Sequence, residues 1–211
     1  MTPLISPELD SYILELLPAR TAVLAEMEAL AAEQDVPIVG PAVGTLLSIL
    51  ARSIGADRVF ELGSAIGYST AFFAEAVGKG GQVFYTDGSP ENAAQARGYL
   101  ERMGLLDRVT IKVGDAVTSL DQTKGYFDVV FIDIDKEGYP AALQAAAPRV
   151  RRGGYLLADN VLWSGKVVDA KAGDAATEGI RQFNRTLFSL AEFRTVIVPL
   201  RDGVAIARRE S

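Results

Sequence analysis

Apolar residues along this chain fall into two patterns, short continuous runs and longer stretches at helical spacing. The short runs predict strands at 59–62, 82–86, 109–113, 127–132 and 155–158. Helical spacing predicts helices at 68–77, 90–103, 139–150 and 178–190. Two further runs, 195–199 and 204–208, flank Arg201-Asp-Gly, a sequence typical of a hairpin turn. Strands that alternate with helices predict an α/β protein with a mostly parallel sheet covered on both faces.

The chain before the first strand predicts a helical lead-in rather than a separate domain. Apolar side chains recur near helical spacing over 7–34, where Pro18 is expected to end or kink the helix, and again over 43–54. With 211 residues, the chain is long enough for one domain with a substantial core. We therefore predict a single domain, with a lead-in over 1–55 and an α/β core over 56–211.

A glycine-bearing turn separates the first predicted strand from its helix. Gly63 and Gly67 allow backbone angles and close approach that a Cβ atom would forbid. A strand, loop and helix in this order present free backbone N–H groups at the carboxyl edge of a sheet, where α/β folds bind ligands. The pattern is Gly-x-x-x-Gly preceded by Glu61, which differs from the Gly-x-Gly-x-x-Gly of dinucleotide enzymes.

Acidic residues end most of the predicted strands. They are Glu61, Asp87, Asp115, Asp133 and Asp159. The ends of parallel strands share one edge of a sheet, so these carboxylates are expected to converge on one crevice. Any one of them alone is more simply a turn residue or a helix cap. Asp87 lies 20 residues past Gly67, where a carboxylate can accept both hydroxyls of a ribose, which serves NAD and S-adenosylmethionine equally well.

Composition narrows the chemistry further. The net charge is −6, which argues against nucleic acid and anionic membranes as partners, and no apolar run is long enough to span a membrane. The N-terminus lacks the layout of a secretion signal, so we expect a cytoplasmic protein. The chain has no cysteine and no histidine, which excludes thiolate chemistry and a Ser-His-Asp triad. Any metal must therefore be held by oxygen, which favours Mg²⁺, Mn²⁺ or Ca²⁺.

One group of residues is a candidate cation site. Asp133, Asp159 and Asn160 offer two carboxylates and one amide oxygen, which are three hard ligands. Lys136 lies three residues beyond Asp133, close enough for its ammonium to reach the same crevice. Without histidine, a lysine whose pKa is lowered by a nearby metal is the natural candidate for a general base. The simpler alternatives are helix caps and an exposed lysine.

The motifs that carry a family resemblance lie in order along the chain. They are Glu-Leu-Gly-Ser-Ala-Ile-Gly-Tyr-Ser-Thr at 61–70, Asp-Gly-Ser-Pro-Glu at 87–91, Phe-Asp-Val-Val-Phe-Ile-Asp-Ile-Asp-Lys at 127–136, Gly-Gly-Tyr-Leu-Leu-Ala-Asp-Asn-Val-Leu-Trp-Ser-Gly at 153–165 and Asp-Gly-Val-Ala-Ile-Ala-Arg-Arg at 202–209. As a set they resemble the cation-dependent O-methyltransferases of the caffeoyl-CoA and catechol type, within the class I S-adenosylmethionine-dependent methyltransferases. The resemblance runs from about residue 35 to the end.

The resemblance implies a Rossmann-like class I methyltransferase fold, with seven mostly parallel strands and an antiparallel C-terminal hairpin strand. It implies a site for S-adenosylmethionine and one for a divalent cation, usually Mg²⁺. Asp133, Asp159 and Asn160 match the cation ligands, and Lys136 matches the lysine proposed to deprotonate the acceptor. The implied contacts of the cofactor are Glu61, Gly63, Ser69 and Asp133 at its amino-acid end, Asp87 at its ribose, Asp115 and Ala116 at its adenine, Val39 through its backbone, and the loop residues Ser64, Gly67 and Tyr68.

The methyl acceptor is left open. Chelation favours vicinal diols, so a catechol-like phenol is the expected substrate class. However, Ile134 and Asp135 stand where the animal catechol enzymes carry histidine and tryptophan, and 165–177 matches no acceptor-binding segment. Residues 165–177 belong to a long loop, 161–177, which we expect to be functional or mobile. Family members are often dimers, and a homodimer is expected.

Two rival functions remain. One is an NAD-dependent oxidoreductase on a similar fold, which is disfavoured by the glycine spacing and by the lack of an evident Tyr-x-x-x-Lys or histidine proton donor. The other is a protein that binds S-adenosylmethionine without turnover. A nucleic-acid methyltransferase is disfavoured by the acidic charge and by the absence of an Asn-Pro-Pro-Tyr-type motif.

Overall fold

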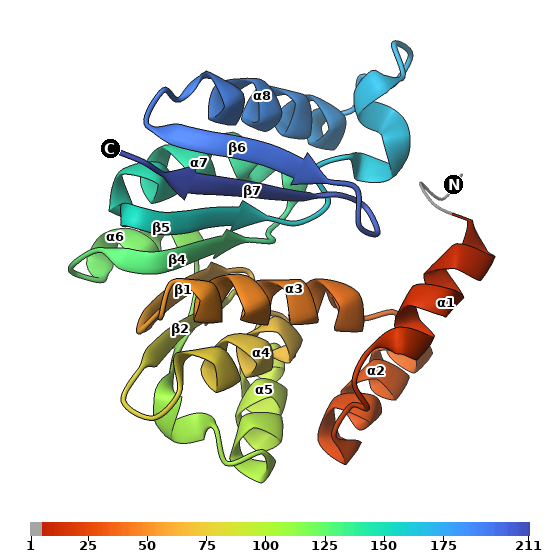
Figure 1. Cartoon of the computed structure of the whole chain (residues 1–211), viewed down its shortest axis with the longest axis vertical. Coiled ribbons are helices and arrows are strands. Elements are labelled where there is room, and N and C mark those ends of the chain that lie inside the picture. Colours follow the sequence, from red (N-terminus) through yellow and green to blue (C-terminus); the bar gives the residue numbers. More distant parts are fainter. Residues whose placement is uncertain (1–5) are drawn as a thin grey trace.

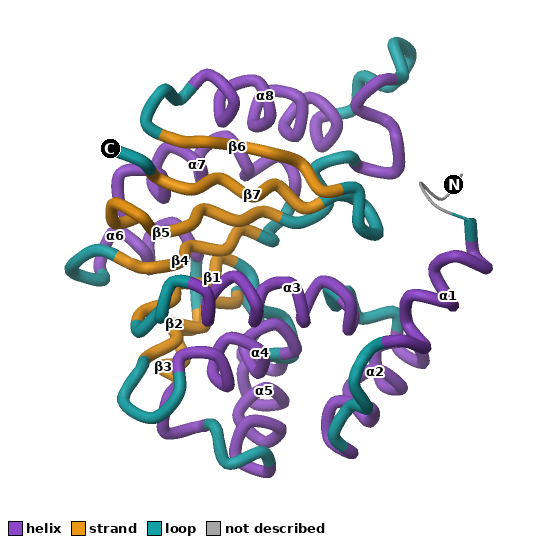
Figure 2. The backbone as a smooth tube through the Cα atoms, viewed as in Figure 1, coloured by secondary structure: helices purple, strands orange, loops and turns teal. Residues whose placement is uncertain are grey.

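One seven-stranded sheet organises the molecule (Figures 1 and 2). The computed structural model describes residues 6–211. The strands are β1 (Arg58–Leu62), β2 (Gln82–Asp87), β3 (Val109–Val113), β4 (Phe127–Ile132), β5 (Val150–Ala158), β6 (Phe193–Val198) and β7 (Val204–Arg209). Their order across the sheet is β3-β2-β1-β4-β5-β7-β6, and β7 alone runs antiparallel to both of its neighbours. The predicted fold, a mostly parallel sheet with an antiparallel C-terminal strand, is confirmed.

Helices cover both faces of this sheet. The helices are α1 (Pro7–Leu16), α2 (Ala22–Gln34), α3 (Gly40–Ser53), α4 (Tyr68–Val77), α5 (Pro90–Arg102), α6 (Ala116–Gln122), α7 (Tyr139–Ala146) and α8 (Ala175–Ser189). Apolar side chains of α2 to α5 form one core with the sheet, and those of α6 to α8 form another core on its opposite face. In the lead-in, α1 buries none of its side chains, whereas α2 buries Leu24 and Met27.

Local sequence explains where the elements begin. Five helices, α1, α2, α5, α6 and α8, start at residues whose side-chain oxygen accepts a backbone N–H of the first turn, which satisfies an otherwise unpaired donor. The central strand β4 has five of its six residues buried, as expected for a strand covered on both faces. Its one polar residue, Asp128, accepts the backbone N–H groups of Asp57 and Arg58 at 2.9 and 2.7 Å and pairs with Arg151. This contact holds the start of β1 beside β4.

The structure differs from the sequence-based elements in three places. Helix α6 was not predicted, because its seven residues give too little periodicity to read. Strand β5 begins at Val150, where we predicted the end of a helix. The predicted loop 161–177 contains a kinked 3₁₀ segment, Trp163–Val168, and its last residues already belong to α8.

The loop is also tied down rather than free. The guanidinium of Arg181 on α8 donates to the backbone carbonyl oxygens of Val167 and Lys166, both at 3.0 Å, and of Ala172 at 2.7 Å. Buried carbonyl groups need such partners, and one arginine supplies several at once. These hydrogen bonds hold part of the loop against α8, and the expectation that the loop is functional or mobile stays a prediction.

The topology creates one favourable place for a ligand. From β1, the chain continues to β2 on one side, and β4 lies on the other side, so the strand order reverses at this point. Ligands of open α/β sheets bind beyond the carboxyl ends of the strands at such a reversal.

Figure 1 shows α1 and α2 beyond the end of α3, away from the sheet. Within residues 6–211, no helix is both long and apolar enough to cross a membrane.

Candidate active site

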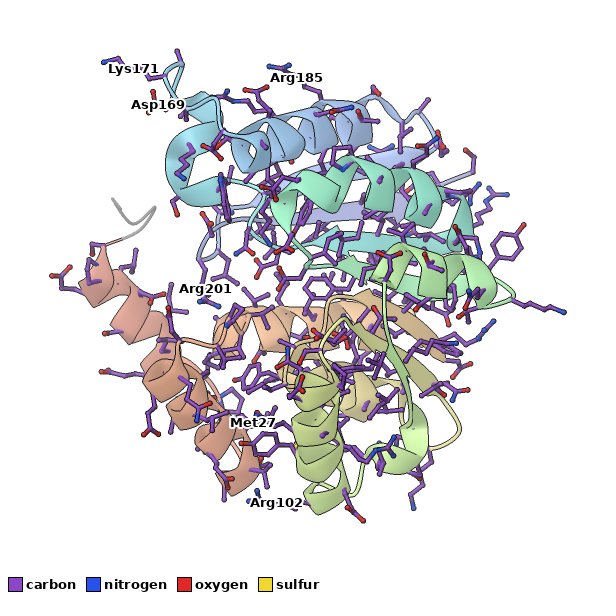
Figure 3. All side chains as sticks on the ribbon, turned by 180° about the vertical axis from the view of Figure 1, so that it is seen from behind. Met27, Arg102, Asp169, Lys171, Arg185 and Arg201 are labelled. Atoms are coloured by element: carbon purple, nitrogen blue, oxygen red, sulfur yellow. The ribbon has the colours of Figure 1, made fainter. Side chains whose placement is uncertain are left out.

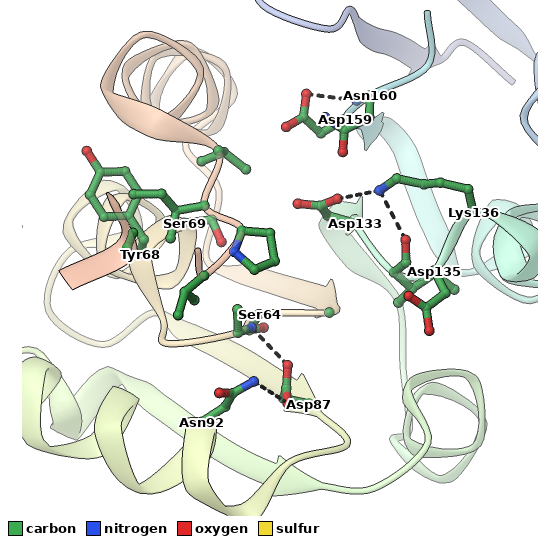
Figure 4. Close-up of a pocket in the computed structure, with 18 of the residues that line it drawn as sticks. Ser64, Tyr68, Ser69, Asp87, Asn92, Asp133, Asp135, Lys136, Asp159 and Asn160 are labelled. Carbon is green, nitrogen blue, oxygen red and sulfur yellow. Dashed lines mark hydrogen bonds and ion pairs between the residues drawn. The ribbon is translucent and has the colours of Figure 1, made fainter. Parts of the chain in front are cut away.

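A cavity of about 1380 Å³ opens at the carboxyl ends of β1, β2, β4 and β5. The predicted cofactor and cation residues that line it are Val39, Gly63, Ser64, Tyr68, Ser69, Asp87, Asp115, Ala116, Asp133, Lys136, Asp159 and Asn160. Glu61 and Gly67 do not line it. In Figure 4, Ser64, Asp87 and Asn92 lie toward one end of the cavity, and Asp133, Lys136, Asp159 and Asn160 lie together at the other.

Glycines shape the loop between β1 and α4. Gly63 has φ +83°, and a Cβ atom at this position would lie 2.2 Å from the carbonyl oxygen of Asp133. Gly67 has φ +86°, and its Cβ would lie 2.9 Å from the Cβ of Ala96 on α5. The first glycine thus lets β1 and β4 approach at the cavity, while the second lets α4 pack against α5. Gly67 therefore supports the loop from behind, since it packs toward α5 and does not line the cavity.

Glu61 lies beneath the loop between β1 and α4 and accepts hydrogen bonds from the loop and from α4. It is fully buried, and its Oε2 accepts the hydroxyl groups of Ser64 at 3.2 Å and Thr70 at 2.5 Å. Its other oxygen, Oε1, is buried without a hydrogen-bond partner among the described residues. Burial raises the pKa of Glu61 to about 7, although the hydroxyl groups of Thr70, Ser69 and Ser64 oppose the rise. The carboxyl group is therefore a support for the loop whose charge is sensitive to pH.

Asp87 fixes the other side of the same loop. Its Oδ2 accepts the backbone N–H of Ala65 at 2.9 Å, and its Oδ1 accepts from the backbone of Ser89 at 2.8 Å and the amide of Asn92 at 3.0 Å. Ala65 has φ +43°, a conformation that few non-glycine residues adopt. The carboxylate is thus oriented at the end of β2, in the position predicted for a ribose contact.

Asp115 and Ala116 start α6 at the edge of the cavity. Asp115 caps the helix, and its Oδ1 accepts the backbone N–H of Thr118 at 2.7 Å. The side-chain and backbone hydrogen bonds from Thr118 lower the pKa of Asp115. Asp115 is exposed and Ala116 is buried. The capping role, which was the simpler interpretation from sequence, is what the structure shows, and both residues also line the cavity.

The lead-in closes one wall of the cavity. Val39, at the start of α3, is buried and lines it together with Asp10 and Leu14 of α1. The hydroxyl group of Tyr68 donates to Oε1 of Glu28 on α2 at 2.7 Å. Burial raises the pKa of this phenol far above its usual value, so Tyr68 stays a hydrogen-bond donor at all ordinary pH. Sequence reasoning missed Glu28, because nothing marks a contact between residues 40 positions apart.

Lys136 and Asp133 form a partly buried ion pair at the far end. The ammonium of Lys136 lies 2.9 Å from Oδ1 of Asp133 and also donates to the carbonyl oxygen of Ile134 and the hydroxyl oxygen of Tyr139, both at 3.1 Å. The hydroxyl group of Tyr139 in turn donates to the carbonyl oxygen of Asp159 at 2.8 Å. Tyr139, which was not predicted as a site residue, thereby connects the ends of β4 and β5.

Asp159 is a buried carboxyl group that lies near a second acidic residue, Asp133. It is 2% exposed, and its Oδ1 accepts the backbone N–H of Asn160 at 2.9 Å. Burial, followed by repulsion from Asp133, raises its pKa to about 7, and the charges of Arg201 and Lys136 oppose this rise. Asn160 has φ +57°, in the left-handed region that asparagine tolerates better than most residues. The two carboxylates therefore repel one another in a partly desolvated corner.

Few side chains at this corner could coordinate a metal ion. Within residues 6–211, no three histidine, cysteine, aspartate or glutamate side chains gather as a metal cluster. The predicted set has only two carboxylates and takes its third oxygen from the amide of Asn160. Two further residues of this corner were missed from sequence: Arg201, considered only as part of a hairpin turn, and Trp163, both of which line the cavity.

Comparisons with known proteins agree with this geometry. A family model described as O-methyltransferase matches residues 15–210. A catechol O-methyltransferase from Niastella koreensis is 36% identical over 210 residues, covering 94% of this chain and 95% of that protein. A catechol O-methyltransferase from Mycobacterium tuberculosis is 38% identical over 191 residues, covering 88% and 84%. The structure of an O-methyltransferase from Bacillus cereus in complex with SAH superposes with a TM-score of 0.88 at 30% identity, covering 96% of this chain and 97% of that one.

Proposed function

Since this chain belongs to the O-methyltransferase family and is an S-adenosylmethionine-dependent O-methyltransferase, we propose that it uses a divalent cation to methylate a catechol-like diol. The observation that carries this proposal is the pair of carboxylates, Asp133 and Asp159, brought to one corner of the cavity that also holds the glycine loop.

The residues around the glycine loop suit S-adenosylmethionine. The cavity is large enough for this cofactor together with a small acceptor. Its lining contains far more acidic than basic residues, which suits a ligand whose sulfonium and amino groups are positive. The buried Oε1 of Glu61 lacks a partner in the described part of the chain. We propose that Asp87 holds the ribose, that Ser69 and Asp133 hold the amino-acid end, and that Glu61 acts through Ser64 and Thr70.

The opposite corner suits a hard divalent cation. Burial, followed by repulsion from Asp133, raises the pKa of Asp159 to about 7, and a bound cation would oppose both effects by stabilising the two carboxylates. Asp133, Asp159 and Asn160 would hold the ion through oxygen atoms, which suits Mg²⁺ and leaves positions for water or for two hydroxyl groups of an acceptor. When bound, such an ion would lower the pKa of a neighbouring hydroxyl group.

Lys136 is placed to handle the proton of the acceptor. Its ammonium already lies within hydrogen-bond distance of Asp133 and Tyr139. The side chain is 11% exposed, so the amine is held in one position and kept largely away from solvent. We propose that Lys136 in its neutral form accepts the hydroxyl proton while Asp133 keeps the amine in place. The acceptor oxygen can then bond to the methyl carbon of the sulfonium as the carbon–sulfur bond breaks.

Metal dependence is the direct test of this proposal. Purified protein with S-adenosylmethionine and catechol is expected to lose methyl transfer in excess EDTA and to recover it when Mg²⁺ is added back. Cofactor binding, followed by calorimetry in the same solutions, should persist in EDTA, because the glycine loop does not use the ion. Undiminished turnover after thorough chelation would contradict the role of the cation and leave the methyltransferase assignment standing.

The oligomeric state and the cellular location of the protein stay predictions. A homodimer is expected from the family resemblance, and sedimentation of the purified protein would decide it. The cytoplasmic location also stays a prediction.

A further inference from the structure

Arg201 occupies an unusual position in the turn between β6 and β7. Its backbone has φ +50°, the left-handed region that turns of this kind normally fill with glycine, asparagine or aspartate. A long side chain in a strained backbone position is retained only where something compensates for the strain, and such outliers cluster at functional sites. The side chain of Arg201 is therefore where a function should be sought.

The guanidinium of Arg201 reaches across to the lead-in. Its Nη1 donates to the carbonyl oxygen of Ile38 at 2.8 Å. It lies against Gly40, which has φ +72°, and a Cβ atom added to Gly40 would come within 3.0 Å of Nη1. Figure 3 shows Arg201 between the N-terminal helices and the upper part of the sheet. One edge of the guanidinium is thus fixed at the start of α3.

The turn itself is anchored beside the proposed cation ligands. The backbone N–H of Val161 donates to the carbonyl oxygen of Gly203 at 3.0 Å, and that of Leu162 donates to the carbonyl oxygen of Asp202 at 2.9 Å. Val161 and Leu162 directly follow Asn160. These bonds place Arg201 at the acceptor end of the cavity, which it lines together with Asp159 and Asn160.

Arg201 makes no close ion pair in the described part of the chain, although its charge acts on Asp159 and Asp202. Among the described residues that line the cavity, only Lys136 and Arg201 are basic, and Lys136 is paired with Asp133 at 2.9 Å. Within residues 6–211, Arg201 makes no ion pair, and Nη1 is the only one of its nitrogen atoms with a hydrogen-bond partner. The Nε and Nη2 edge of the guanidinium therefore keeps its donors, in the geometry that matches a carboxylate.

We propose that Arg201 is a specificity residue that binds a carboxylate on the methyl acceptor, so that the preferred substrates are catechol-like diols bearing a carboxylic acid. This inference rests on the proposed function. The diol would lie at Asp133, Asp159 and Asn160, and the acid group would point toward the β6–β7 turn. Asp10 and Asp35, which also line the cavity, would disfavour an acid group placed anywhere else along this wall.

The test compares two acceptors of nearly the same shape, 3,4-dihydroxybenzoate and 3,4-dihydroxybenzamide, which differ in charge. The variant Arg201→Gln removes the charge and shortens the side chain, while it keeps a polar, non-glycine residue in the left-handed turn position. Arg185→Gln, on the exposed outer surface of α8 and away from the cavity (Figure 3), is the matched control. Arg201→Lys keeps the charge and removes the planar fork.

We expect the unaltered enzyme to prefer the benzoate in kcat/KM, and Arg201→Gln to reduce the ratio of the two kcat/KM values by about tenfold or more, mainly through KM for the benzoate. Arg185→Gln should leave the ratio unchanged, and Arg201→Lys should fall between. An equal loss on both acceptors would make Arg201 only a support for Ile38 and overturn the assignment. Methylation of both with no preference would also overturn it while leaving the proposed function intact, whereas failure to methylate any diol would reject the proposed function itself.

Discussion

The two ends of the cavity are organised in different ways. At the end of β2, the carboxylate of Asp87 accepts three hydrogen bonds, from Ala65, Ser89 and Asn92, and each comes from the protein itself. At the ends of β4 and β5, the buried Asp159 accepts one, from Asn160, and shares its corner with the like charge of Asp133. The first carboxylate is held by several donors of the protein, whereas the second is buried near a like charge and accepts a single hydrogen bond.

This difference indicates which interactions hold the carboxylates in place at each end of the cavity. A carboxylate with three donors holds its position without a ligand, so the loop that meets the cofactor is preorganised. Two neighbouring carboxylates, of which Asp133 pairs with Lys136, repel one another, and the proposed cation would relieve this repulsion. Disturbing the second end should therefore affect chemistry more than folding, and disturbing the first end should affect folding and cofactor binding together.

The largest effect is expected from Asp159→Ala. If the proposed ion stabilises the transition state by several kcal/mol, loss of one of its two carboxylates should reduce kcat/KM by about 10³ to 10⁴ at saturating Mg²⁺. The melting temperature at pH 8 should not fall, since the variant removes a buried charge. Asp135→Ala, which removes an exposed acid from the same wall, is the control and should keep most activity. Equal losses in the two variants would contradict a specific role for Asp159.

Lys136→Met should be next in size. Removal of the proposed base, with little change in side-chain length, should lower kcat by about 10³ while leaving KM for S-adenosylmethionine unchanged. Mg²⁺ affinity, measured by calorimetry, should stay equal or rise, because the ammonium that pairs with Asp133 is gone. Weaker Mg²⁺ binding would instead show that Lys136 supports the ion. Lys136→Arg serves as the control that keeps the charge and lacks a titrating base.

A smaller effect is expected from Glu61 as a dependence of stability on pH. Its pKa rises from 4.5 to about 7 on folding, so between these values the folded state binds a proton that the unfolded state has released. The free energy of unfolding must then fall as pH rises through this window, by about 3 kcal/mol for this group.

The variant Glu61→Gln isolates that contribution. It should lose stability less steeply than the unaltered protein between pH 5 and 8 in urea titrations without cofactor. Asp159 titrates in the same range and contributes equally to both proteins, so their difference reports Glu61. Parallel curves would mean that Glu61 remains ionised on folding.

The smallest effect is expected from Asp115→Ala. Loss of the cap of α6 should cost about 1 kcal/mol of stability, measured by chemical unfolding. Affinity for S-adenosylmethionine should fall by less than about tenfold, because the exposed carboxylate contributes little beyond the start of the helix. Asp115→Asn, which keeps a capping oxygen, should lose less stability than the alanine variant. A loss of affinity as large as that of kcat/KM in Asp159→Ala would place Asp115 directly at the ligand.

Much of the sheet and of the cavity wall was predictable from sequence. The strands and the acids at their ends were readable because apolar runs and the polar residues that end them are local patterns. The capping role of Asp115 was considered as the simpler alternative and is what the structure shows. By contrast, α6 was missed because seven residues provide less than two full turns of periodicity. The contacts that hold loop 161–177 could not be predicted because its partner, Arg181, lies in the next helix.

The sequence by itself determined the order of strands and helices, the glycine turn, and which oxygen ligands were available once histidine and cysteine were absent. Only the tertiary structure decided that Glu61 lies behind the loop and that Tyr68 contacts Glu28. It alone brought Arg201 to Ile38, 163 residues away in the chain. The physical reason is that local patterns specify backbone conformation over a few residues, while contacts between distant side chains depend on how the sheet twists and how its helices pack against it.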